Sequence, residues 1–177
     1  GNAGNVTLTA ASGSIAVDAI NASSTAGNGG NLFITAAGNV VTGGLTATGG
    51  SQGGDITLRS TGGNVDTSTI VSDDGQPVGG TVSATAGDGT GGELTFAAAG
   101  TITPADNVLT TGNDVTFDGP VALTANNAFA GPTVSVVIDG EGGDIEFTDA
   151  VNQARNLVLS PGGGSIRVAG PAGATAA

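Results

Sequence analysis

Apolar residues alternate with polar ones in short runs that return along most of the chain. In "GGDITLRSTGGNV", residues 53 to 65, Ile56 and Leu58 lie two positions apart with a threonine between them. This is the period of a β-strand that buries one face. The sequence predicts six equivalent strands, with the buried pairs Val6 and Leu8, Leu32 and Ile34, Ile56 and Leu58, Leu94 and Phe96, Val115 and Phe117, and Ile145 and Phe147.

Two more apolar positions follow each of the first four pairs at nearly constant offsets. Three apolar patches per repeat predict a triangular coil, and stacked coils place three parallel sheets around one core. The first two repeats, from Val6 to Leu32 and from Leu32 to Ile56, measure 26 and 24 residues, as in solenoids. We therefore predict an all-β parallel β-helix (β-solenoid) with three short strands per coil, whose further rows are Ile15, Val41, Val65 and Ile102, and Ile20, Leu45, Ile70 and Val108.

The spacing of these rows also predicts how the chain is divided. Residues 1–112 form coils with repeats of about 24–26 residues and an insertion near 80–92, residues 113–170 form coils of a second, longer type, and 171–177 form a disordered tail or linker stub. Glycine pairs are expected at the corners, where glycine accepts a positive φ. A β-sandwich is the alternative, but it needs no constant offsets, and 34 glycines disfavour helices.

Composition narrows the partners and the chemistry. The chain has 15 acidic residues, three arginines and no lysine, for a net charge of −12. Binding to nucleic acid is therefore not expected, because phosphates require a basic face. No apolar run approaches the roughly 20 residues of a membrane span, so membrane insertion is not expected either. The chain also begins inside a repeat, from which we expect a piece of a longer protein.

The richest acidic cluster lies in "DGEGGDIE", which contains Asp139, Glu141, Asp144 and Glu146. Four carboxylates among glycines form a candidate calcium site, because Ca²⁺ prefers oxygen ligands. The same residues also fit solvated turn and strand-edge groups. A carbohydrate-active β-helix enzyme is the alternative function, since an inverting glycosidase needs two carboxylates about 6.5–9.5 Å apart. Because His, Cys, Lys and Tyr are absent, we expect no enzymatic activity and assign no catalytic residue and no required cofactor.

Phe33 is the one aromatic residue that the alternation predicts to point outward. It is a candidate contact for a partner, and the alternative is that it packs under a loop. Ice binding by ladders of threonine pairs is a second alternative function. The pairs that begin at Thr7, Thr46, Thr67 and Thr101 recur at uneven intervals, which disfavours one stacked file.

The phrases "GNGGNLFITAAGNVVTGGLTATGGSQGGDITLRSTGGNV" (27 to 65), "NDVTFDGPVALTANN" (113 to 127) and "DIEFTDAVNQARNLVLS" (144 to 160) resemble the passenger repeats of filamentous haemagglutinin-type bacterial exoproteins. The resemblance implies a right-handed parallel β-helix, exported by two-partner secretion and located outside the cell or on its surface. Such proteins act as adhesins, biofilm components or stalks of toxins. It offers no catalytic residues to carry over.

Together these observations predict a structural and adhesive segment that acts as an extended stalk and a weak multivalent binder. Its expected partners are the flanking repeats of a longer parent chain, and glycans of cell surfaces or other cells. End-to-end self-association is expected as well, because terminal coils expose unpaired sheet edges.

Overall fold

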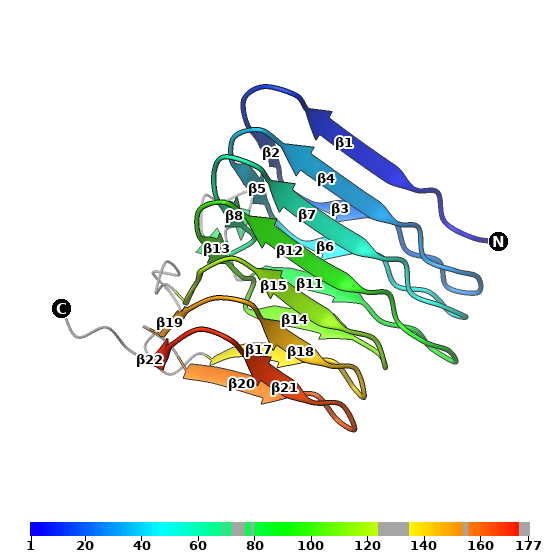
Figure 1. Cartoon of the computed structure of the whole chain (residues 1–177). Coiled ribbons are helices and arrows are strands. Elements are labelled where there is room, and N and C mark those ends of the chain that lie inside the picture. The colour runs from blue at the N-terminus through cyan, green and yellow to red at the C-terminus, as the bar shows by residue number, and fades with distance from the viewer. Residues whose placement is uncertain (69, 72–76, 79, 124–134, 154–155, 174–177) are drawn as a thin grey trace.

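The computed structural model describes residues 1–68, 70–71, 77–78, 80–123, 135–153 and 156–173. Figure 1 shows a stack of coils with the N-terminal strand at one end and the last strands at the other. No helix occurs in these described ranges. Three parallel sheets of seven, seven and six strands run along the stack. The predicted all-β parallel β-helix with three strands per coil is confirmed.

The first sheet contains all six predicted apolar pairs. Val6 is in register with Leu32, Leu32 with Ile56, and Ile56 with Leu94, and the file continues through Val115 and Ile145. It also runs without a break across residue 112, where the coil type was predicted to change. The strands of the sheet are β1 (Val6–Ala10), β4 (Leu32–Ala36), β7 (Ile56–Ser60), β12 (Leu94–Ala98), β15 (Val115–Asp118), β18 (Ile145–Phe147) and β21 (Ile166–Val168).

The second sheet stands at the next side of the triangle. One of its predicted positions is wrong by one residue, because Val40 and not Val41 is in register with Ile15 and Val65. Val40 is fully buried and Val41 half-buried. The strands are β2 (Ile15–Val17), β5 (Val40–Thr42), β8 (Val65–Asp66), β13 (Ile102–Thr103), β16 (Val121–Leu123), β19 (Val151–Gln153) and β22 (Ala172–Gly173).

The third sheet corrects the prediction for the third coil. Its strand there is β11, in which Val82, and not Ile70, is in register with Leu45 and Val108. The strands of the sheet are β3 (Ile20–Asn21), β6 (Leu45–Thr46), β11 (Thr81–Ala84), β14 (Asn107–Thr110), β17 (Ser135–Asp139) and β20 (Asn156–Ser160).

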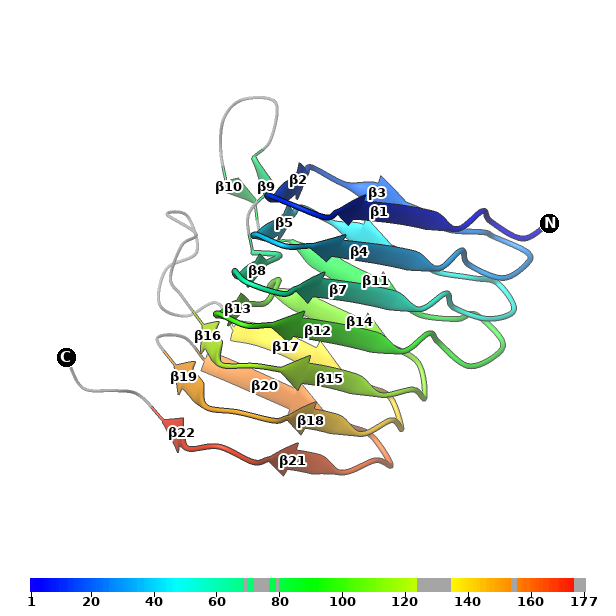
Figure 2. The same cartoon turned by 45° about the horizontal axis from the view of Figure 1, so that its top comes forward.

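The insertion of the third coil begins before residue 80. Strands β9 (Ile70–Val71) and β10 (Pro77–Val78) pair antiparallel with each other and join none of the three sheets. Figure 2 shows them beside the stack. The predicted insertion near 80–92 was therefore misplaced, since Thr81–Ala84 belongs to a coil strand. At the other end, Ala172 and Gly173 pair with β19, so residues 171–173 are not part of a disordered tail. Residues 174–177 lie outside the described ranges.

The glycine pairs serve close packing between coils. Gly30, Gly54 and Gly92, which end three of the pairs, do not have φ in the left-handed range. A Cβ on any of them would lie under 3.0 Å from a carbonyl oxygen of the preceding coil. The expected positive φ is therefore wrong for these pairs. Glycine is needed there because one backbone lies directly on another, which leaves no room for a side chain.

Buried side chains of like size stack in files through the core. Phe96, Phe117 and Phe147 occupy one file, and each is fully buried. Neighbouring rings in this file are stacked, with centroids 4.9 Å apart and an angle of 7° between their planes. The centroid spacing matches the separation of hydrogen-bonded strands. The stack therefore supports the register of the coils from β12 to β18.

We expect Phe117→Ala to lower the free energy of unfolding by about 3–5 kcal/mol, because it leaves a cavity between two buried rings. Phe117→Leu is the matched control, since Leu8 and Leu58 lie in the same file of the core. We expect this control to cost clearly less than the alanine variant, because leucine leaves a smaller cavity. Chemical denaturation followed by circular dichroism measures both values. Equal losses for the two variants would contradict the cavity as the cause of the loss, because leucine refills most of the space without a ring.

Candidate functional site

The four predicted calcium ligands lie around the corner between β17 and β18. Asp139 ends β17, Glu146 lies on β18, and Glu141 and Asp144 lie in the connection between these strands. Across the described ranges, no group of three or more acidic side chains has a geometry that could hold a metal ion. The structure therefore does not gather the four carboxylates into one centre.

Asp144 is instead part of a ladder of side chains that joins successive coils. Its Oδ1 accepts hydrogen bonds from the Ser165 backbone N–H and hydroxyl, both at 2.8 Å, and its own N–H donates to Asp114 Oδ1 at 2.9 Å. The same bond occurs in earlier coils, where Asn31 N–H donates to Asn5 Oδ1 and Asp55 N–H to Asn31 Oδ1. Asparagine and aspartate can both fill this position because each has an Oδ1 atom that accepts the N–H of the next coil.

The ladder also perturbs the titration of Asp144. The hydrogen bond from the Ser165 backbone, and after it the bond from the Ser165 hydroxyl, lowers the pKa of Asp144 below its ordinary value. Both bonds favour the ionised carboxylate. The ionised carboxylate of Asp144 thus binds Ser165 of the next coil.

The other three residues of the cluster, Asp139, Glu141 and Glu146, have separate structural roles. Glu146 forms an ion pair with Arg167, which is its neighbour in register on β21. Asp139 Oδ1 accepts a hydrogen bond from the Glu141 N–H at 3.1 Å. Glu141 itself has a φ of 42°, which places it in the left-handed region within the turn. This arrangement corresponds to the alternative of turn and strand-edge carboxylates.

Phe33 lies on the outer face of the first sheet, where 38% of it is exposed. It is in register with Thr7 in the coil before it and Thr57 in the coil after it. An aromatic ring therefore interrupts a file of threonines on a solvent-facing surface. Its role as a partner contact stays a prediction.

A second feature of this surface is a cleft of about 440 Å³ at the corner between the first and second sheets. It lies where that corner becomes shorter. The length of the corner can be counted from the second inward-facing residue of the first-sheet strand to the first residue of the second-sheet strand. In the first four coils this length is six or seven residues, as from Phe96 to Ile102. In later coils the separation is four, as from Phe117 to Val121. A shorter corner follows a tighter path, so the surface steps inward.

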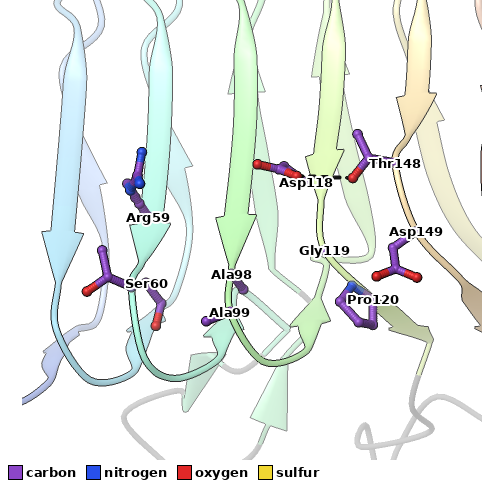
Figure 3. Close-up of a pocket in the computed structure, with 10 residues that line it drawn as sticks. Arg59, Ser60, Ala98, Ala99, Asp118, Gly119, Pro120, Thr148 and Asp149 are labelled. Carbon is purple, nitrogen blue, oxygen red and sulfur yellow. Dashed lines mark hydrogen bonds between the residues drawn. The ribbon is translucent and has the colours of Figure 1, made fainter.

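The walls of the cleft come from four successive coils. Figure 3 shows Arg59 on one side, Ala98 and Ala99 in the middle, and Asp118 and Asp149 on the other side. The hydroxyl of Thr148 donates to Asp118 Oδ1 at 3.1 Å. The side chains thus form a cation and two carboxylates on opposite sides of a floor of small residues.

Glycine at position 119 lets the coils approach closely beneath the cleft. Gly119 has a φ of 138°, and a Cβ there would meet the carbonyl oxygen of Ala98. Pro120 follows it, and its carbonyl accepts the N–H of Ile102 at 2.8 Å. The sequence "DGPV" therefore makes a tight corner bonded to the coil before it.

The cleft was missed at the sequence level because its residues belong to different repeats. Two signals could have indicated it. One is the shortening of the corner in "FDGPV" and "FTDAV", and the other is Arg59, one of only three cations in the chain. No family model, curated protein or solved structure matches the chain. In the part of the chain that the structure describes, no helix is long and apolar enough to cross a membrane.

The lowered pKa of Asp144 predicts a pH-dependent contribution to stability. The ionised carboxylate should stabilise the fold above the ordinary aspartate pKa of 3.8, and this contribution should be lost as the pH falls through the lower pKa of the folded state. Asp144→Asn keeps the acceptor oxygen, so its melting temperature should fall less between pH 7 and pH 3 than that of the unmodified chain. Asp144→Ala, which removes the acceptor, should melt at a lower temperature at pH 7.

Thermal unfolding of the three proteins at both pH values measures these effects. If Asp144→Asn lost as much stability on acidification as the unmodified chain, the assignment of this contribution to Asp144 would be wrong.

Proposed function

We propose that the chain is a structural and adhesive segment of a secreted or cell-surface bacterial β-solenoid exoprotein of the filamentous haemagglutinin type. The observation that carries this proposal is the unbroken register of the first sheet, from β1 to β21. Each coil bonds to its neighbours and adds about 4.8 Å of length, so repetition produces an extended and rigid stalk. Outer surfaces repeated along such a stalk favour weak multivalent binding.

The two ends of the stack support flanking coils as partners. In the middle of the first sheet the inward-facing residues are fully buried, whereas Ile166 is 45% and Val168 38% exposed on β21. At the other end, Val6 and Leu8 are half-buried. An additional coil on either side would cover these side chains. It would come from the repeats of a longer parent chain or, by end-to-end association, from a second copy.

If the segment is adhesive, beads coated with the intact chain should attach to cell surfaces, and attachment should rise more steeply than in proportion to coating density. The physical reason is that several weak contacts must form together. Flow-chamber counting of attached beads measures this, with the acid-unfolded chain at the same coating density as the control. Attachment that is absent at every density, or equal for the unfolded chain, would contradict an adhesive role.

One observation favours ice binding as a second candidate function. The threonines in register on the first sheet are Thr7, Thr57, Thr95 and Thr116, a set different from the unevenly spaced pairs of the sequence. Phe33 interrupts this file between Thr7 and Thr57. The file thus offers a row of threonine hydroxyl and methyl groups, interrupted by one partly exposed ring.

For an ice-binding surface, Phe33→Thr should increase the inhibition of ice recrystallisation, because it completes the file. Thr95→Lys should decrease it, because a long charged side chain then stands in the row. Microscopy of ice grain size over time measures both effects at matched concentration. Inhibition that is absent in all three proteins would eliminate this second function.

A further inference from the structure

Arg59 is a cation without a partner among the described residues of a strongly acidic chain. Arg167 forms an ion pair with Glu146, whereas Arg59 makes no hydrogen bond or ion pair with any residue in the described ranges. Arg155 lies outside those ranges. With 15 acidic residues against three arginines, unused positive charge is scarce in this protein. A free guanidinium beside a cleft therefore offers hydrogen-bond donors to a ligand.

The register places Arg59 two coils away from Asp118, which is a carboxylate on the other side of the cleft. Arg59 is in register with Ala97, and Ala97 with Asp118. Two strand spacings, about 9.6 Å, thus separate the backbones of the opposite charges. The intervening coil contributes only alanines at this place, Ala97, Ala98 and Ala99. The gap leaves room for a ring-sized ligand with polar groups on both sides.

Phe33 extends the same surface on the far side of Arg59. Thr35 is in register with Arg59, and Phe33 lies two residues before Thr35 on the same face. Phe33 and Arg59 are therefore diagonal neighbours on adjacent coils. The partly exposed ring offers a flat apolar surface to the C–H face of a sugar. The strands of Phe33 and Asp118 are three strand spacings apart, a distance of roughly 14 Å.

The geometry points to a binding track for a short neutral oligosaccharide, from Phe33 past Arg59 to Asp118 and Asp149. A sugar hydroxyl both donates and accepts hydrogen bonds, so it can satisfy the guanidinium on one side and the carboxylates on the other. The net charge of −12 disfavours a polyanion, and a guanidinium facing two carboxylates matches the acceptor and donor groups of a neutral sugar. This inference rests on the proposed adhesive function, for which it names the ligand class and the site.

The cleft volume of about 440 Å³ falls within the range of small-molecule sites. The site is shallow and repeats with each copy of the segment, so a single contact is expected to be weak and several together to be strong.

The test uses the intact chain and three neutral trisaccharides, maltotriose, cellotriose and triacetylchitotriose, with trigalacturonic acid as the charged comparison. Titration by nuclear magnetic resonance measures the dissociation constants. We expect at least one neutral trisaccharide to bind, and to bind more tightly than the acid. If only the acid bound, or none of the four, the inference would be overturned.

Three variants locate the site, and each is chosen to preserve the fold. Phe33→Thr matches Thr7 and Thr57 in its file, Arg59→Ala matches Ala97, and Asp118→Asn keeps an oxygen to accept the Thr148 hydroxyl. We expect each to weaken binding of the trisaccharide at least tenfold. Arg167→Ala and Val158→Thr are the controls on other parts of the surface, and they should change binding less than twofold.

Equal losses in the controls and the site variants, or no loss in the site variants, would overturn the inference. The bead experiment separates this result from failure of the proposed function. If coated beads attach to cells equally well with the unmodified chain and with Arg59→Ala, the chain is adhesive and the track is not its site. If the unmodified chain gives no attachment while a trisaccharide still binds at the track, the site is correct and the adhesive function is not.

Discussion

Backbone hydrogen bonds between parallel strands hold each coil to the next and fix which residue lies above which. Because the register is shared by all coils, a residue suits its position only if it also suits the positions above and below it. Phe96, Phe117 and Phe147 satisfy this by stacking ring on ring. Gly30 and Gly54 satisfy it by having no side chain where two backbones meet. Asn31 and Asp55 satisfy it by bonding across the gap at a corner.

This constraint explains which parts of the fold the sequence predicts. The first sheet follows directly from the alternation, because each of its strands has two inward-facing apolar residues at a spacing of two, as in Leu94 and Phe96. In the first four coils the strands of the second and third sheets are shorter than those of the first, and their positions depend on counting through corners. One residue fewer in the corner of the second coil made Val41 appear to be the core position in place of Val40. The antiparallel pair β9 and β10 displaced the core position from Ile70 to Val82.

The candidate sites were harder to predict for a related reason. Asp139, Glu141, Asp144 and Glu146 are close in sequence, but a corner directs them to different neighbours, and Asp144 has the role that Asn5 and Asn31 have in earlier coils. In the opposite case, Arg59 and Asp118 are 59 positions apart in the chain and only two coils apart in space. Proximity in a solenoid is set by register, so a local cluster of acidic residues is a weak guide to a site.

Corner length is the variable that this architecture leaves free. The strands must keep their register, so a change of two or three residues at a corner cannot disturb the core and instead changes the outer surface. Such a change occurs between the coil of Ile102 and the next coil, that of Val121, whose corner is shorter. The cleft lies where these two coils meet. A regular stack can therefore carry a local site without any loss of its regular core. We therefore expect binding sites in this protein at places where the corner length changes on the outer surface while the strands keep their register in the core.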